Sequence, residues 1–315
     1  MQLHSTTAEP GMLWVSRARI WLKVVLKSGL GVIGIVWGAF APPRPGLRVL
    51  LYHRVNPHRF DQLGPVSREI SVRPAAFERQ LRLLRKQGWR TLGPDELHAT
   101  VLGERELQRR DIVITFDDGY EDNLRWAAPL LREHGFVAVI FVTTTRFGQD
   151  SDAAGWGSDA PGCGRFLSVA QLQQWLDLGL HLGSHTHTHT LAGQLDEAGL
   201  LDEYQRSRQL LEHGFGRPVR LLAYPDGSHD ARAQAAAARA GYIASFTTTP
   251  GLNRADTPPH ALRRTEVSAS DPFWVFRMKL RGALDWLWFK ESPRLRDAVR
   301  LSNRFLVRLL TKERE

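Results

Sequence analysis

The sequence has little cysteine and no long apolar run, and each absence excludes a class of protein. Cys163 is the only cysteine among 315 residues, so the chain cannot form an internal disulfide or a cysteine-based metal site. Lys23 and Lys27 interrupt the apolar residues 20–41, which leaves about fourteen uninterrupted residues, whereas a helix that spans a bilayer needs ~20. A metal site in this chain would therefore use histidine and carboxylate ligands.

The composition is that of a folded protein with an excess of positive charge. The chain is 43% hydrophobic and 24% charged, which is typical of a globular protein. Its net charge of +9 fits a nucleic acid, a lipid surface or an acidic polymer as partner. Nothing else in the sequence supports nucleic-acid binding, and we expect none. We divide the chain into an N-terminal apolar and basic segment (1–46), a folded domain (47–268) and basic C-terminal helices (269–315).

The N-terminal segment has two interpretations. Basic residues followed by the apolar residues 20–41 are typical of an uncleaved membrane anchor or of a helix that lies in the membrane interface. A helix packed against the folded domain is the alternative, because Lys23 and Lys27 interrupt the apolar run. The proline-rich residues 42–46 then form a stiff linker.

The C-terminal segment has a basic, amphipathic pattern. Arginines recur every four residues at positions 296, 300, 304 and 308, on a different helical face from leucine and phenylalanine. This pattern suits an anionic membrane surface, and it also suits a helix that packs on the folded domain with its arginines in water. We therefore expect a membrane-associated protein of the bacterial inner membrane.

Strands and helices alternate through the folded domain. Residues 47–53, 111–116 and 137–142 are short apolar runs typical of buried strands, and segments with helical spacing separate them. This alternation predicts parallel βα units. The glycine-rich residues 148–165 are expected to form a loop insertion without chemistry of its own.

Two adjacent carboxylates follow the central strand. Residues 112–116 run directly into Asp117, Asp118 and Gly119. Because side chains alternate along a strand, neighbours at its end can point in different directions. Asp118 could then bind a metal while Asp117 accepts a proton. Taken alone, Asp-Asp-Gly also fits an ordinary turn.

Three histidines alternate with threonines about seventy residues downstream. His185 and His189 are four residues apart, a spacing that would place both on one side of a helical turn. Two histidines and one carboxylate are the usual ligands of a hydrolytic zinc site, and Asp118 would be the third ligand. Any two of the three histidines satisfy this count, but His187 is two residues from each neighbour and is expected to face away. A polar surface run is the alternative interpretation.

Three motifs in this chain resemble those of the NodB-homology polysaccharide deacetylases (carbohydrate esterase family 4). They are Thr-Phe-Asp-Asp-Gly at 115–119, His-Thr-His-Thr-His-Thr at 185–190 and Ala-Tyr-Pro-Asp-Gly at 223–227. The resemblance covers roughly residues 47–267 and implies an α/β fold, a distorted (β/α) barrel. The N- and C-terminal segments would be helical extensions of that barrel.

The resemblance also implies an activity and a set of roles. Members hydrolyse N-acetyl groups from glycans that contain N-acetylglucosamine, so the implied partner is an N-acetylated glycan. Asp117 would be the general base. Asp118, His185 and His189 would hold zinc or a similar divalent ion.

A fourth stretch is similar to one branch of the family, the deacetylases of exopolysaccharide and biofilm systems. Residues 51–55 (Leu-Tyr-His-Arg-Val) match the opening of that branch, which implies His53 as a general acid. A structural histidine is the alternative. Other members carry the acid in a Leu-x-x-His motif, but in residues 262–265 (Leu-Arg-Arg-Thr) no histidine is present, which favours His53.

The third motif departs from the commoner family pattern. Ala223 stands where the family has an arginine, and Asp226 stands where it has an aromatic residue. The resemblance implies that the backbone N–H of Asp226 stabilises the oxyanion. The Asp226 carboxylate should then point away, because it would oppose developing negative charge. From its place in the pattern, Arg264 is the candidate for the missing positive charge near Asp117.

These observations predict a metal-dependent hydrolase that removes N-acetyl groups from a polysaccharide or its lipid-linked precursor. An O-acetyl esterase on the same fold is one alternative, because attack on an ester uses the same groups. A non-catalytic protein that binds glycans or membranes is the other, favoured by the departures at Ala223 and Asp226.

Overall fold

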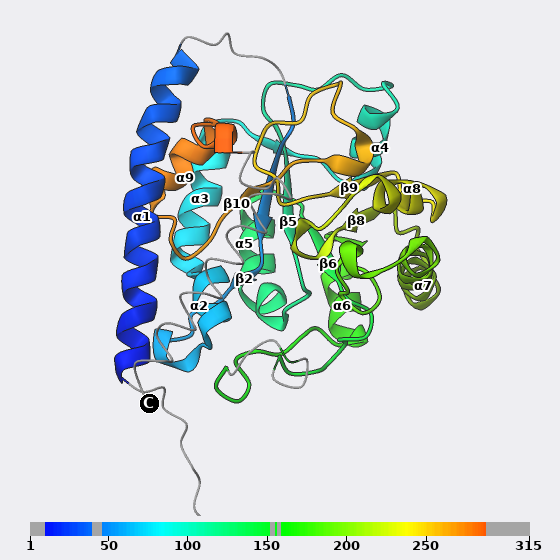
Figure 1. The fold of residues 1–315 in the computed structure, drawn as a ribbon, viewed down its shortest axis with the longest axis horizontal. Coiled ribbons are helices and arrows are strands. Elements are labelled where there is room, and N and C mark those ends of the chain that lie inside the picture. Colours follow the sequence, from blue (N-terminus) through cyan, green and yellow to red (C-terminus); the bar gives the residue numbers. More distant parts are fainter. Residues whose placement is uncertain (1–9, 40–45, 152–154, 156–158, 288–315) are drawn as a thin grey trace, which may run out of the picture.

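The computed structural model describes residues 10–39, 46–151, 155 and 159–287. Their main feature is a curled, parallel half-barrel sheet flanked by helices (Figure 1), as the alternation of strands and helices predicts. The strand order is β10-β1-β5-β6-β7-β8-β9, with β4 paired to β5. The strands are β1 (Arg48–Tyr52), β4 (Arg90–Thr91), β5 (Asp111–Phe116), β6 (Val139–Val142), β7 (His181–Ser184), β8 (Leu221–Ala223), β9 (Ala244–Phe246) and β10 (Thr265–Glu266), and β2 (Arg54–Val55) pairs with β3 (Ser71–Val72) apart from them.

The helices begin and end at the residues that local chemistry favours. Pro65, Pro74 and Pro94 each occupy the first turn of a helix, where the missing N–H costs nothing. Ser168 accepts a hydrogen bond from the Gln171 N–H and caps its helix. The helices are α1 (Pro10–Ala39), α2 (Pro65–Ile70), α3 (Pro74–Lys86), α4 (Pro94–Val101), α5 (Ala128–His134), α6 (Val169–Asp177), α7 (Glu197–Phe215), α8 (Ala231–Arg239) and α9 (Phe273–Leu280).

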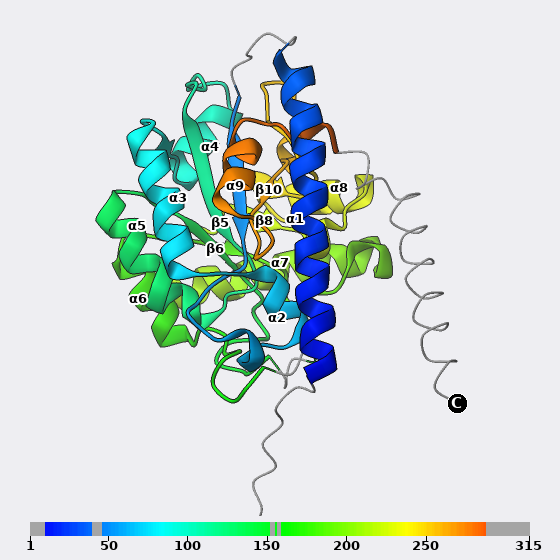
Figure 2. The same ribbon diagram turned by 90° about the vertical axis from the view of Figure 1, so that its left-hand side faces the viewer.

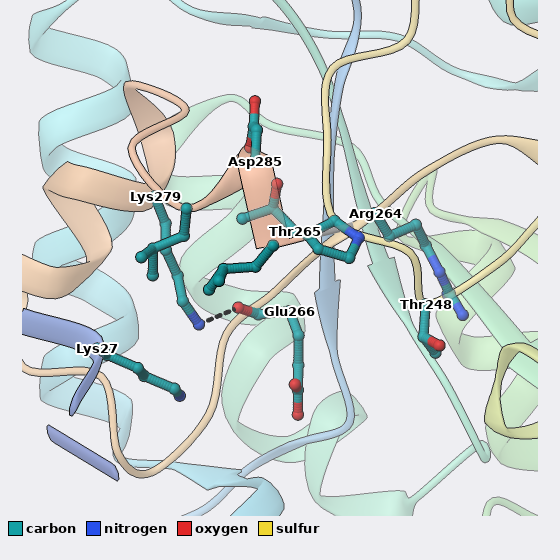
Figure 3. A pocket seen from close by; sticks show the side chains of 10 residues that line it. Lys27, Thr248, Arg264, Thr265, Glu266, Lys279 and Asp285 are labelled. Carbon is teal, nitrogen blue, oxygen red and sulfur yellow. Dashed lines mark hydrogen bonds between the residues drawn. The ribbon is translucent and has the colours of Figure 1, made fainter. Parts of the chain in front are cut away.

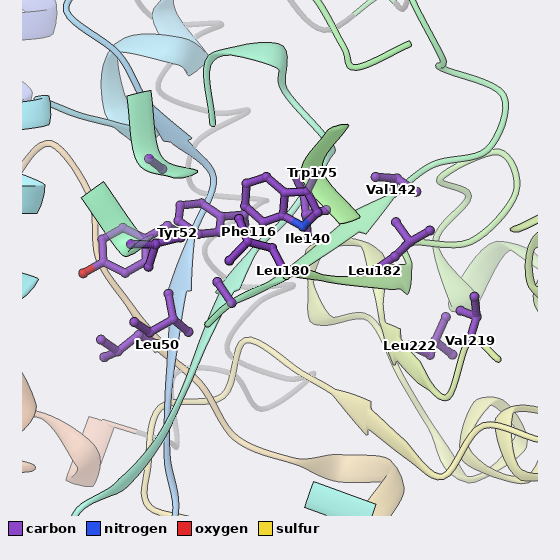
Figure 4. Packing of buried hydrophobic residues seen from close by; sticks show 14 of the residues in the cluster. Leu50, Tyr52, Phe116, Ile140, Val142, Trp175, Leu180, Leu182, Val219 and Leu222 are labelled. Atoms are coloured by element: carbon purple, nitrogen blue, oxygen red, sulfur yellow. The ribbon is translucent and has the colours of Figure 1, made fainter. Parts of the chain in front are cut away.

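Alternate residues of the strands form two cores on the two faces of the sheet. One face packs against the surrounding helices, where Tyr52 stacks on Phe116 with ring centroids 5.5 Å apart and Trp175 meets Phe116 edge-on (Figure 4). The other face fills the half-barrel with smaller residues such as Val49 and Val113. Residues that leave the carboxyl ends of these strands therefore start from a rigid base.

Helix α1 packs along one side of the half-barrel, beside α9 and α2 (Figure 2). Its two lysines face the protein. Lys27 Nζ lies 2.8 Å from Asp271 Oδ1 and donates to Ser268 and Ser270, and Asp271 also accepts a hydrogen bond from Lys279 at 2.6 Å. The described part of α1 therefore agrees with the interpretation of a helix packed against the domain.

Replacing Lys27 with methionine should lower the free energy of unfolding by about 2 kcal/mol. Breaking a buried ion pair costs more than this when the remaining charge has no partner. Here the cost is smaller, because Asp271 is still paired with Lys279 in the variant. The matched control is Lys23→Met, because Lys23 pairs with Glu69 where both side chains are largely exposed, and such a pair is worth about 0–1 kcal/mol. Urea unfolding of the two variants measures the difference; equal losses would show that Lys27 does not dock α1.

The loop insertion does more than the sequence indicates. Asp159 lies in it and is 8% exposed. Its carboxylate is 2.6 Å from the buried guanidinium of Arg54, which also pairs with Asp122 at 2.7 Å. The loop therefore has a structural role that the sequence did not indicate, because Asp159 fixes it to the segment that follows His53; the prediction that it has no chemistry of its own stays a prediction.

Other expectations concern the two extensions. Among residues 10–39, 46–151, 155 and 159–287, no helix is both long and apolar enough to cross a bilayer. The predicted basic helix between residues 294 and 310 lies outside the described residues. So does most of the linker at 42–46.

Candidate metal and catalytic site

The site residues come from the carboxyl ends of strands β1, β5 and β7 of the same parallel sheet. Asp117 and Asp118 follow β5, and His185 follows β7. His53 follows β1, which pairs with β5. Parallel strands present their carboxyl ends at the same edge, which is the usual place for a site in an α/β fold. Thus segments far apart in sequence meet in space.

Asp118, His185 and His189 form a compact group of potential metal ligands. Their ligand atoms all lie within 4.8 Å of one another. His185 Nε2 is 3.3 Å from Asp118 Oδ1, and His189 Nε2 is 3.7 Å from the same oxygen. The other nitrogen of His185, Nδ1, is 2.8 Å from the carbonyl oxygen of Ala223, which orients the ring and leaves Nε2 directed at Asp118.

The backbone between the two histidines is not a helical turn. The prediction that helical spacing places His185 and His189 side by side is therefore wrong. Residues 185–190 lie in no helix or strand. Thr186 and His189 have positive φ angles of 66° each, and the His189 N–H donates to Thr186 Oγ1 at 3.1 Å. Two left-handed residues, and not helical periodicity, bring the imidazoles together with ring centroids 4.8 Å apart.

His187 is turned away, as its spacing predicts. Its Nδ1 atom is 2.7 Å from the hydroxyl of Thr144. Its backbone N–H and that of Thr188 both donate to the carboxylate of Glu203, at 3.0 and 2.9 Å. Glu203 of α7 holds this loop, and the sequence contains no signal for it, because only its burial distinguishes it from the other carboxylates of that helix.

Asp117 is paired with Arg264. The guanidinium donates two hydrogen bonds to the carboxylate, each 2.7 Å long, and Arg264 is fully buried. Burial alone would raise the pKa of Asp117, but the charge and hydrogen bonds of Arg264, together with the charges of His185 and His53, outweigh it and lower the pKa. Asp117 is therefore ionised and can accept a proton. The structure brings Arg264 to the place proposed for it, while the catalytic roles of both residues stay predictions.

His53 lies close to both carboxylates. Its charge helps to lower the pKa of Asp117 and of Asp118, and its backbone carbonyl accepts a hydrogen bond from Asn123 at 2.7 Å. Its Nδ1 atom is buried without a hydrogen-bond partner among the described residues. This placement allows proton transfer at the site, and the assignment of His53 as the acid stays a prediction.

Asp226 follows β8 and lies at the rim of the site. Its side chain is exposed, and its charge acts to raise the pKa of His189. The Asp226 carboxylate is thus near the site, whereas the predicted oxyanion role of its backbone N–H requires the carboxylate to point away. The role of its backbone N–H stays a prediction.

Backbone strain is concentrated here. Among the described residues, the non-glycine residues with positive φ are Asp118, Thr186, His189 and Asp226. All four belong to the site or its rim. Such conformations cost free energy and persist where the surrounding structure imposes them, so the surrounding fold holds these site residues in place.

The donor set fits a divalent cation. Burial and the charge of His185 lower the pKa of His189 to about 4, so its imidazole is neutral and keeps a lone pair. Burial raises the pKa of Asp118, but the His185 hydrogen bond and the charge of His53 outweigh it, and the net shift is downward. Burial lowers the pKa of His185, but the charges of Asp117 and Asp118 outweigh it and raise the pKa, and a cation bound beside these carboxylates would take the place of that proton. Imidazole nitrogens and an ionised carboxylate are the ligands expected for zinc and similar metals.

The sequence of this chain is similar to those of known polysaccharide deacetylases. The polysaccharide deacetylase family model matches residues 104–245. A Bacillus subtilis (strain 168) protein named as a polysaccharide deacetylase, YxkH, is 27% identical over 222 residues, which are 70% of this chain and 71% of that protein. The poly-β-1,6-N-acetyl-D-glucosamine N-deacetylase of Escherichia coli (strain K12) is 29% identical over 97 residues, 31% of this chain and 14% of that protein.

A solved structure shows the same fold. IcaB from Ammonifex degensii superposes with a TM-score of 0.62 at 24% identity, covering 76% of this chain and 98% of that one. The match to the family covers residues 104–245 and so does not include His53, Arg264 or α1. The positions of these three come from the structure alone. The chain is therefore similar to polysaccharide deacetylases in sequence over residues 104–245 and in fold over most of its length.

Proposed function

We propose that this protein removes N-acetyl groups from N-acetylated sugars of a polysaccharide or its lipid-linked precursor, with a divalent metal, zinc first among the candidates. The observation that carries the proposal is the juxtaposition of two units. Asp117 is held ionised by Arg264, and His185, whose Nε2 is 4.0 Å from Asp117 Oδ2, belongs to the group of potential ligands. The name of the E. coli relative makes an N-acetylglucosamine polymer the first substrate to test.

The residues present can perform each proton transfer of amide hydrolysis. A divalent cation held by Asp118, His185 and His189 would polarise the acetyl carbonyl and acidify water. As the water oxygen bonds to the carbonyl carbon, Asp117 accepts the water proton. As the C–N bond breaks, His53 donates a proton to the departing nitrogen. The products are acetate and a free amine on the sugar.

Acetate release from a panel of glycans tests this proposal. We expect release from N-acetylglucosamine oligomers that a chelator stops and zinc restores, with a free amine on the product. A free hydroxyl from O-acetylated glycans alone would identify an O-acetyl esterase instead. Binding of the oligomers without any acetate release would identify a non-catalytic binding protein.

We also propose that the outer face of α1 lies on an anionic membrane. Its polar residues face the protein while its outward residues are apolar, the reverse of an ordinary surface helix. These outward residues, 41–67% exposed, are Trp21, Leu22, Val25, Val32, Ile33, Ile35 and Val36. Trp274, 54% exposed, donates a hydrogen bond to Ser28 of α1 and lies beside this face, and tryptophan favours membrane interfaces. The net charge of +9 complements anionic lipid.

Vesicle co-sedimentation of the full chain tests the membrane proposal. Val25→Glu with Val32→Glu should weaken binding to phosphatidylglycerol vesicles by about tenfold or more, because two apolar side chains lose their burial. Leu210→Glu is the matched control, since Leu210 is an exposed apolar residue of α7, on the opposite side of the sheet from α1 (Figure 1). If the α1 variant binds as wild type, or instead changes the oligomeric state, the face is covered by another segment or another copy and the proposal is wrong.

A further inference from the structure

A groove runs between α1 and the half-barrel. It consists of two adjoining cavities, of about 370 and 80 Å³. Both are lined by Lys27, Glu266 and Leu287. The larger cavity extends along α1 past Leu26 and Leu30 to Glu69 and Ile70. Its volume is within the range of small-ligand pockets, and its lining mixes apolar side chains with polar ones.

Glu266 lies where the two cavities meet, and strand register places it near the strand ends that carry the catalytic groups. Glu266 pairs with Leu51 of β1, two residues before His53, and Leu51 pairs with Thr115 of β5, two residues before Asp117. Side chains two residues apart share a face of a strand, so Glu266 is on the same face as Arg264. Figure 3 shows the side chain of Glu266 between Lys27 and Arg264.

The Glu266 carboxylate can accept hydrogen bonds from a ligand. The hydrogen bond from Lys279 goes to its backbone oxygen, and no residue in the described part of the chain donates one to its carboxylate. Water reaches this side chain, yet the surrounding protein atoms act to raise its pKa. The charges of Lys279, Lys27 and His53 outweigh that effect and lower the pKa. An ionised carboxylate thus lines the groove near the proposed acid.

We propose that this groove is a second sugar subsite, in which the Glu266 carboxylate accepts hydrogen bonds from hydroxyls of the sugar next to the one that is deacetylated. This inference rests on the proposed function. A carboxylate can accept from two hydroxyls at once, and Leu26 and Leu30 offer apolar surface for a sugar ring. Lys27 and Lys279 already balance the charge of Glu266, so the groove suits a neutral N-acetylated sugar better than a cationic amino sugar.

The test compares Glu266→Gln with wild type on N-acetylglucosamine oligomers of increasing length and on a small acetate ester without a sugar. The variant should lose about tenfold or more in kcat/KM on long oligomers, chiefly through KM, because a hydrogen bond to a charged acceptor is lost. The loss should shrink as the oligomer shortens. Glu78→Gln is the control, since Glu78 pairs with Arg82 on the surface of α3.

An equal loss on every substrate, the ester included, would place Glu266 at the reacting group and overturn the subsite. Equal rates for Glu266→Gln and wild type on long oligomers would also overturn the subsite. Calorimetric binding of the same oligomers to Asp117→Asn, with and without Glu266→Gln, separates the two proposals. Weaker binding without Glu266 supports the subsite even if wild type releases no acetate, a result that would refute the deacetylase assignment alone.

Discussion

Replacing Asp117 with asparagine is expected to reduce acetate release by about a thousandfold while the metal content stays the same. An amide of the same shape cannot accept the proton of the attacking water, and general-base catalysis contributes about 10²–10⁴ to a rate. The potential ligands Asp118, His185 and His189 are untouched. Rates on an N-acetylglucosamine oligomer and metal analysis by mass spectrometry measure the two quantities on the same preparation.

His185→Ala is the matched comparison. It removes an imidazole whose Nε2 is 3.3 Å from Asp118 Oδ1, so both metal and activity should be lost. If Asp117→Asn also lost its metal, Asp117 would be a ligand. If it kept full turnover, another group would be the base.

Replacing Arg264 with methionine is expected to destabilise the protein by about 4 kcal/mol and to abolish most activity. The substitution leaves the Asp117 carboxylate buried without its guanidinium, and an orphaned buried charge costs about 3–5 kcal/mol. For a domain of this size that corresponds to a fall in Tm on the order of 10 °C. The stability and activity of Arg264→Lys should lie between those of wild type and Arg264→Met, because one ammonium cannot reproduce two parallel hydrogen bonds.

Two controls make the Arg264 prediction specific. Arg263→Met changes the neighbouring, exposed arginine and should alter stability by less than about 0.5 kcal/mol. In the Asp117→Asn background, Arg264→Met should cost about 2 kcal/mol less than in wild type, because the buried carboxylate is already gone. Additive losses in the double variant would mean that Arg264 stabilises the fold independently of Asp117.

The part of the fold that could be predicted is the part with local signals. The apolar run 112–116 and the capping serine at 168 depend on residues close in sequence, and the strand and the helix are found there. Asp118, His185 and His189 could be named because two histidines and a carboxylate are the usual ligands of a hydrolytic zinc site and because they lie in motifs that resemble those of a known family, although the helical spacing expected of the histidines is wrong.

The remainder depends on contacts between distant residues. Asp159 and Arg54 are 105 positions apart, so no local pattern shows that the loop is fixed to the domain. The left-handed Thr186 could not be predicted either, since threonine rarely adopts positive φ. From the sequence, the lysines of α1 fit either a membrane-associated helix or a helix packed against the domain. Only their partners Glu69 and Asp271 show that they face the protein.

The left-handed conformation of Thr186 has a consequence for attempts to make this enzyme more heat-resistant. A glycine at this position would relieve the unfavourable φ and could raise the melting temperature. It would also delete the hydroxyl that accepts the His189 N–H and so loosen an imidazole that the chemistry needs. Selection for thermal endurance alone should therefore favour substitutions here that slow the enzyme, and screens should score both properties together.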